Sequence, residues 1–226
     1  MDDTCPLQGR RTRRRARREI ETWHLVIEGE TCQFDGTKRQ EGEGRMLSRL
    51  FNRGDRRIAA TLYASAVERA RQPVFYRHFA VADTIDGRFD MVTLQVILLL
   101  NRFKGLSDKR LARLSQNVFD SMFMDMDRTL RELGVGDQGV PHRVKKMAQA
   151  FYGRLSAYDG ALAAADDGPL GEALIRNLYR GAEVEPGLVR QLAAHVRQVA
   201  ALYAATPVET FLAGTLPAAP ALQETA

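Results

Sequence analysis

The chain has 226 residues, of which 45% are apolar and 27% are charged, with a formal net charge of +5. This length and composition exclude a wholly disordered chain and favour a single globular domain with a sizeable core. The longest nearly apolar run, residues 91–100, would rise only about 15 Å as a helix and is too short to span a bilayer. The basic N-terminal region also lacks the apolar segment of a secretory signal.

Residues 1–45 show no sustained helical pattern and contain an arginine-rich run at residues 10–18. We expect this segment to be disordered or to be an upstream extension of a domain that begins at Met46. An arm that binds RNA or a ribosome is the functional alternative for the arginine-rich run, whereas the many acidic residues argue against a mitochondrial transit peptide. Cys5 and Cys32 lie here without a CxxC pair, which predicts no structural zinc site and leaves open whether they form a disulfide.

Helical periodicity begins after Met46. Residues 46–57 combine apolar side chains with arginines. Such a segment either lies on an anionic membrane surface or packs its apolar side on the domain, and both interpretations stay open. Residues 58–71 then form a helix with one apolar face, which Pro73 closes.

The next helix is the most apolar of the chain and is predicted at the centre of the bundle. Asp83 or Thr84 caps its N-terminus, apolar residues occupy almost every face, and Gly105 ends it. Arg88 and Asp90 lie near its start. There they either satisfy each other and unpaired backbone groups or contact a partner directly.

Two further apolar stripes predict a helical hairpin. Ser107 or Asp108 caps its first helix, and Pro141 fits the first turn of its second helix, after the glycine-rich turn GVGD. Met124 falls off the first stripe and is a candidate for lining a groove that takes a partner's apolar helix. The stripes comprise Phe119, Phe123, Met126, Leu130 and Leu133 in the first helix and Val144, Met147, Phe151, Leu155, Tyr158 and Leu162 in the second.

A shorter helix follows at residues 166–181, and a last one at residues 188–203. Beyond them, the alanine- and proline-rich residues 207–226 are predicted to be flexible. The predicted fold class is therefore all-α: a single bundle of six to seven helices over residues 46–206, with flexible N- and C-terminal tails.

The first helix of the hairpin carries a dense charged face that two hypotheses explain. Residues two apart on a helix point about 200° from one another, so Asp125 and Asp127 are poorly placed to share a metal ion. They are instead spaced to pair with Arg128 and Arg131, and Arg128 with Glu132. Such exposed pairs contribute only about 0.2–0.5 kcal/mol each, so the face is either merely solvated or binds a partner. A magnesium-dependent enzyme that uses the aspartates is the enzymatic alternative.

Other catalytic patterns are missing from the sequence. The four histidines are scattered, with no HExxH motif and no nucleophile elbow. The glycines of the hairpin turn follow no strand, so they do not form a phosphate-binding loop. We therefore predict no catalytic residue, no metal site and no cofactor.

Three stretches of the sequence resemble one known family. DTIDGRFDMVTLQVILLLNR at residues 83–102, DMDRTLRELGVGD at 125–137 and HRVKKMAQAFYGR at 142–154 are similar to the ubiquinol-cytochrome c chaperone family, in register from about residue 46 to residue 179. The resemblance implies a non-enzymatic assembly chaperone that binds newly synthesised cytochrome b, or another subunit of ubiquinol-cytochrome c reductase, non-covalently. It also implies the ribosome and a second assembly factor as further partners, and no DNA. The expected location is the bacterial cytoplasm or the periphery of the inner membrane, with mitochondria as the alternative.

The resemblance also selects candidate partner-binding residues, because the family's signature falls on the charged face and on the helix after the turn. Arg88 and Asp90 are predicted to be either structural or partner-binding. The predicted partner-binding residues are Asp125, Asp127, Arg128, Arg131, Glu132, Lys145, Lys146, Phe151, Tyr152 and Arg154.

Overall fold

The computed structural model describes residues 44–222, with side chains from Arg53 onward. Several predictions therefore lie outside the described residues. They concern the N-terminal extension, the arginine-rich run at residues 10–18, the pairing of Cys5 with Cys32, and the side chains of residues 46–52.

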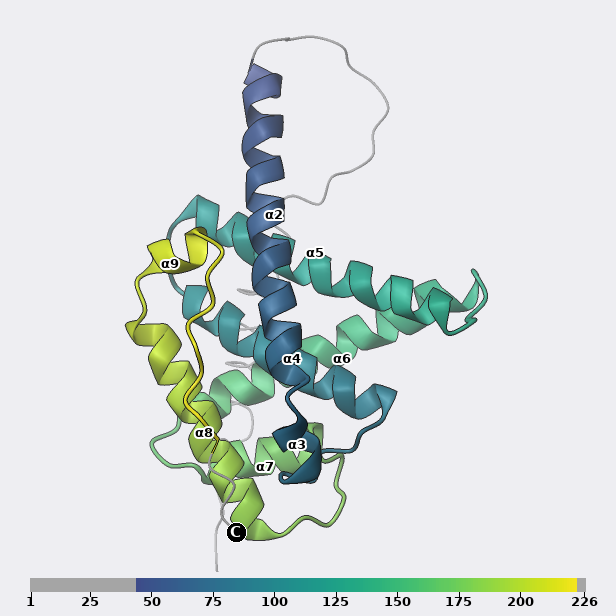
Figure 1. Cartoon of the computed structure of the whole chain (residues 1–226), viewed down its shortest axis with the longest axis vertical. Coiled ribbons are helices and arrows are strands. Elements are labelled where there is room, and N and C mark those ends of the chain that lie inside the picture. Colours follow the sequence, from purple (N-terminus) through teal and green to yellow (C-terminus); the bar gives the residue numbers. More distant parts are fainter. Residues whose placement is uncertain (1–43, 223–226) are drawn as a thin grey trace, which may run out of the picture. The chain divides into compact units, whose positions relative to one another are not determined.

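All regular structure in residues 44–222 is helical, which confirms the all-α prediction (Figure 1). None of the helices in this part of the chain combines the length and the apolar character that crossing a membrane requires. The helices are α2 (Gly44–Ala70), α3 (Pro73–Arg77), α4 (Ile85–Phe103), α5 (Lys109–Glu132), α6 (Gly139–Leu162), α7 (Gly168–Asn177), α8 (Pro186–Ala205) and α9 (Val208–Leu212).

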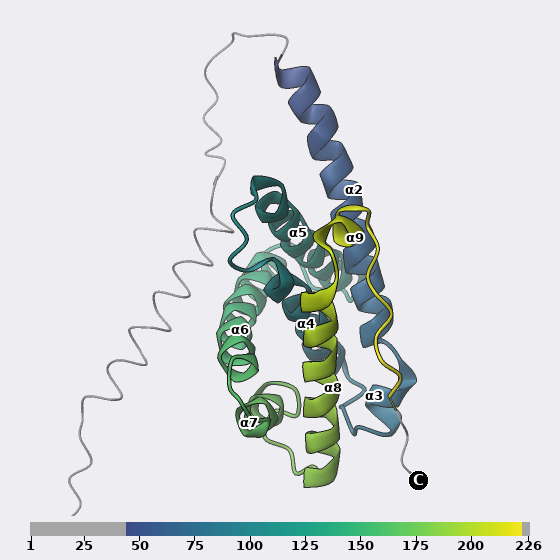
Figure 2. The same cartoon turned by 90° about the vertical axis from the view of Figure 1, so that its left-hand side faces the viewer.

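Helix α4 is the centre of the bundle, as its sequence predicts. The Thr84 hydroxyl caps it by accepting a hydrogen bond from the Gly87 backbone N–H at 3.1 Å. Every residue from 89 to 100 is buried, because α4 packs against α2, α5, α6 and α8. Figure 2 shows α4 between α6 and α8. A side chain at position 87 would place its Cβ 2.0 Å from the Ala82 carbonyl oxygen, so glycine is required where the chain turns into the helix.

Helices α5 and α6 form the predicted hairpin, whose turn lies beyond the other helices (Figure 1). Asp108 caps α5 by accepting from the Arg110 N–H at 2.6 Å, and Gly134 ends the hairpin's first arm with a φ of +79°. The buried side of α5 differs from the predicted stripe, because the fully covered apolar residues cluster nearer the start of the helix. They are Leu111, Leu114, Val118 and Met122, with Leu130 buried further along.

The C-terminal region departs from the prediction of a flexible tail. Helix α9 places Phe211 in the core, with its ring 5.4 Å from that of Phe103 and 5.8 Å from that of Tyr203. The Arg69 guanidinium, on α2, donates to the carbonyl of Pro217, which lies beyond α9, and to the Tyr203 hydroxyl on α8. Residues 208–217 are therefore packed on α2, α4 and α8.

Candidate functional site

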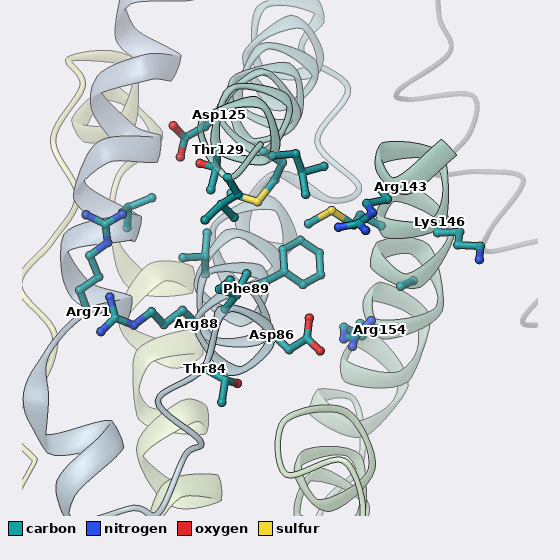
Figure 3. Close-up of a pocket in the computed structure, with 18 of the residues that line it drawn as sticks. Arg71, Thr84, Asp86, Arg88, Phe89, Asp125, Thr129, Arg143, Lys146 and Arg154 are labelled. Atoms are coloured by element: carbon teal, nitrogen blue, oxygen red, sulfur yellow. The ribbon is translucent and has the colours of Figure 1, made fainter. Parts of the chain in front are cut away.

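A groove of about 910 Å³ lies between helices α2, α4, α5 and α6 (Figure 3). We call it the apolar groove, since most of its floor is hydrocarbon. Two of its residues are also largely exposed: Ile85 to 61% and Leu133 to 54%. The apolar side chains that line it are Val67, Ile85, Phe89, Val92, Met126, Leu130, Leu133, Met147 and Ala150.

Cations dominate the polar part of the groove, with six basic side chains against two carboxylates. Those on α6 stand on one side of the apolar floor and Arg71, from the loop after α2, stands on the other (Figure 3). A groove with this lining favours an apolar occupant and also raises the local positive potential. The charged residues are Arg71, Arg88, Arg143, Lys146, Arg154, Arg180, Asp86 and Asp125.

Two of these arginines are held by a buried carboxylate on the central helix. Asp90 is only 1% exposed; its two oxygens lie 2.8 Å from Arg154 and 2.6 Å from Arg180. Burial raises the pKa of the Asp90 carboxyl, although the hydrogen bond from Arg180 and the charge of Arg154 act in the opposite direction. Arg154 also lies over the ring of Phe89, at 5.9 Å from the ring centroid. This network joins α4, α6 and the segment after α7 at the base of the groove.

A second polar connection joins α2 to α5. The Tyr63 hydroxyl donates to one oxygen of Asp125 at 2.9 Å, and Arg128 donates to the other at 2.5 Å. Burial raises the pKa of the Tyr63 hydroxyl, and its hydrogen bond to Asp125 raises it further. Tyr63 and Asp125 line both the apolar groove and a second hollow between α2 and α5, which Met124 borders with 72% of its surface exposed.

The predicted ion pairs along α5 are confirmed. Besides the Asp125–Arg128 pair, Arg131 lies 2.7 Å from Asp127 and 2.5 Å from Asp137, and Arg128 lies 3.9 Å from Glu132. Asp127, Arg131 and Glu132 line neither hollow. These three residues therefore belong to a solvated face of the hairpin that is separate from the groove.

Three other candidate residues need correction or refinement. Phe151 has no exposed surface and packs edge-on against Phe119 at 5.3 Å, so it is a core residue and cannot touch a partner in this structure. Tyr152 is half-buried, 5.7 Å from the Phe119 ring. Arg88 pairs with Asp83 at 2.6 Å instead of with Asp90, which leaves Arg88 on the groove and Asp90 beneath it.

The three basic residues predicted to bind a partner from α6, Lys145, Lys146 and Arg154, lie in three different environments. Lys146 is exposed and lines the groove, Lys145 is exposed and does not, and Arg154 is largely enclosed by its pairing with Asp90. Sequence reasoning missed Arg143, although its position three residues before Lys146 puts both on one face of a helix. It also missed Ile85 and Arg71, which no local pattern distinguishes from ordinary surface residues.

Comparison with known proteins gives a consistent result. The family profile described as ubiquinol-cytochrome C chaperone matches residues 77–219. The match begins later than the predicted start near residue 46, and it continues past the predicted end at residue 179 through α8 and α9. A Drosophila melanogaster protein named ubiquinol-cytochrome c reductase complex assembly factor 1 is 25% identical over 186 residues, which cover 76% of this chain and 71% of the relative.

A solved structure is similar over nearly its whole length. The crystal structure of the Cbp3 homolog from Brucella abortus superposes with a TM-score of 0.67 and 40% sequence identity, covering 76% of this chain and 94% of the other. The family match extends over more than half of the chain and includes three of the four helices that form the groove. The chain belongs to the ubiquinol-cytochrome c chaperone family.

Proposed function

We propose that this protein is an assembly chaperone for ubiquinol-cytochrome c reductase, and that it binds newly synthesised cytochrome b non-covalently in the apolar groove. Membership of the family supports the general role. The name of the fly relative supports the reductase complex as its target.

The observation that carries the proposal is the exposed apolar lining of the groove. Ile85 and Leu133 come from different helices, yet both leave more than half of their surface in water beside one hollow. Burying such side chains is favourable by about 25 cal/mol per Å². A newly made membrane subunit presents apolar segments that need the same protection from water. The groove is therefore suited to shielding one such segment until the subunit is assembled.

The mechanism needs no bond to be made or broken. The floor covers apolar side chains of the client, and the surrounding cations set its orientation. Asp125 and Asp127, the pair that suggested a magnesium enzyme, are instead engaged by Tyr63, Arg128 and Arg131. Their arrangement supports a structural role for these carboxylates.

Gene deletion in the source organism tests the role. We expect loss of the protein to lower both the b-type haem spectrum of the reductase and the amount of assembled complex on native gels, with restoration by the wild-type gene. Unchanged cytochrome b and reductase levels in the deletion strain would contradict the proposal.

Site-specific crosslinking tests the groove. A photoreactive amino acid at Leu133 should crosslink to cytochrome b during its synthesis, whereas the same group at Ile175, which is exposed outside the groove, should not. Mass spectrometry of the adducts identifies the captured protein. Equal crosslinking from the two positions would remove the groove from the proposal.

A further inference from the structure

The groove contains positive charge that the described part of the chain does not neutralise. Arg143 and Lys146 line it from α6, three residues apart and both exposed. No carboxylate in residues 53–222 pairs with either one, whereas Arg88, Arg154 and Arg180 each have an aspartate partner. Arg143 and Lys146 are therefore available to an occupant of the groove.

A third such cation stands across the floor. Arg71 follows α2, and Figure 3 shows it on the opposite side of the groove from Arg143 and Lys146. It also forms no ion pair with a carboxylate among residues 53–222. The apolar floor thus has available positive charge along both sides.

The available cations repel an occupant that carries positive charge and attract one that carries negative charge. Their main effect is therefore on the selectivity of binding and on the association rate. The position of the cations also bears on the kind of occupant. The headgroup of a single lipid would pair with cations gathered at one end of the groove. Here the available cations border both sides of the apolar floor instead. A polypeptide segment can present carboxylates on both sides of its apolar residues.

We propose that the groove selects an apolar client segment that is flanked by carboxylates, with Arg143 and Lys146 contacting one flank and Arg71 the other. This inference rests on the proposed function and adds a chemical criterion to it. The carboxylates would neutralise the available cations, while the apolar residues cover the floor between Ile85 and Leu133. A client segment flanked by lysines would be rejected at the same site.

Two synthetic peptides separate charge recognition from apolar contact. Both are fluorescein-labelled, about 12 residues long, enough for three helical turns, and share one leucine–alanine core; one has glutamates at both ends and the other has lysines. Binding to the full chain is measured by fluorescence anisotropy at low and high salt. At low salt we expect the glutamate peptide to bind at least about 10-fold more tightly than the lysine peptide. The preference should shrink as salt screens the charges.

Charge reversal then locates the effect. The double variant Arg143→Glu/Lys146→Glu should bind the glutamate peptide about 25-fold more weakly, at roughly 5-fold per exposed pair, and should gain affinity for the lysine peptide. The control Lys109→Glu/Arg190→Glu has the same net charge change at exposed positions outside the groove. It should keep the wild-type preference. Circular dichroism melting checks that both variants are folded.

Three results would overturn the inference. They are equal binding of both peptides to the wild type, no binding of either, or an equal loss of binding in the control variant. A fourth is binding of vesicles of equal parts phosphatidylglycerol and phosphatidylcholine that competes with the glutamate peptide and is lost in the groove variant, because it would assign the cations to a lipid surface. Each leaves the proposed function standing if crosslinking at Leu133 still captures cytochrome b, so the two failures are distinguishable.

Discussion

At the scale of single residues, Asp90 is the charge on which the base of the groove depends. It is buried on α4 and is the shared partner of Arg154 and Arg180. Removing one member of a buried ion pair usually costs about 3–5 kcal/mol. Here it would leave Arg154, whose side chain is only 13% exposed, without a carboxylate partner, whereas Arg180 would keep Asp86. We therefore predict that Asp90→Asn lowers the free energy of unfolding by about 3 kcal/mol, as measured by urea denaturation.

Asp86 provides the control for that prediction. It pairs with the same Arg180 at 3.0 Å, but its side chain is 70% exposed. Exposed pairs contribute about 1 kcal/mol at most, so Asp86→Asn should change the unfolding free energy little. Similar losses in the two variants would show that burial of Asp90 is not the cause.

His195 predicts a specific acid sensitivity. It is buried on α8 beside Phe75, and burial, assisted by the charge of Arg69, lowers its pKa to about 4. The unfolded imidazole titrates near 6.5. The folded state therefore binds this proton less readily, so the stability that neutral His195 contributes is complete above about pH 6.5 and is lost as the pH falls towards 4.

The variant His195→Leu should remove this part of the pH dependence. Between pH 7 and pH 4 we expect the wild type to lose roughly 3 kcal/mol more unfolding free energy than the variant, from the difference between the two pKa values. Urea denaturation at a series of pH values measures it. The same pH slope in both proteins would assign the acid sensitivity to other groups.

At the scale of elements, α9 is expected to stabilise the bundle through one buried side chain. Phe211 fills the space between Phe103 at the end of α4 and Tyr203 on α8. Truncating a buried phenylalanine to alanine usually costs about 3–5 kcal/mol, so Phe211→Ala should lower the melting temperature by several degrees in calorimetry. Glu209→Ala, at an exposed position of the same helix, is the control. An unchanged melting temperature in Phe211→Ala would mean that α9 does not contribute to stability.

Periodicity and caps predicted most of the helices, because these signals are local. Thr84, Asp108 and Pro141 stand at or near the predicted helix starts. The position of α9 was not predicted, since alanine and proline surround a short segment whose one large core residue is Phe211. Its burial depends on α4 and α8, which lie far away in the sequence.

The candidate site was predicted only in part, for the same reason. The ion pairs along α5 follow from spacing within one helix, but the partners of Asp90 come from α6 and the segment after α7. Phe151 was chosen by resemblance, and its own apolar stripe already indicated a place in the core. The exposure of Leu133 follows from the hairpin turn lying beyond the other helices (Figure 1).

At the scale of the whole molecule, exposed apolar surface concentrates around the two hollows that share Tyr63 and Asp125. Ile85 and Leu133 line the apolar groove, and Met124 lines the second hollow. Because contiguous exposed apolar surface on a folded protein marks an interaction site, this side of the described bundle is the side we expect to bind the client. The remaining large exposed apolar residues, Leu106 and Ile175, line neither hollow.

That distribution gives a prediction that separates binding from stability. In Ile85→Ser/Leu133→Ser, each position loses an apolar side chain that is already more than half in water, so the unfolding free energy should fall by about 2 kcal/mol at most, and no further than in a matched variant at the less exposed Leu106 and Ile175. Binding should be weakened more, because covering the exposed half of each side chain is worth roughly 1 kcal/mol, and two such losses weaken affinity about 30-fold.

The measurement is the amount of cytochrome b that co-purifies with the chaperone from the deletion strain. Leu106→Ser/Ile175→Ser makes the same chemical change away from both hollows and should capture the wild-type amount. A folded groove variant that captures as much cytochrome b as this control would place the client on another surface.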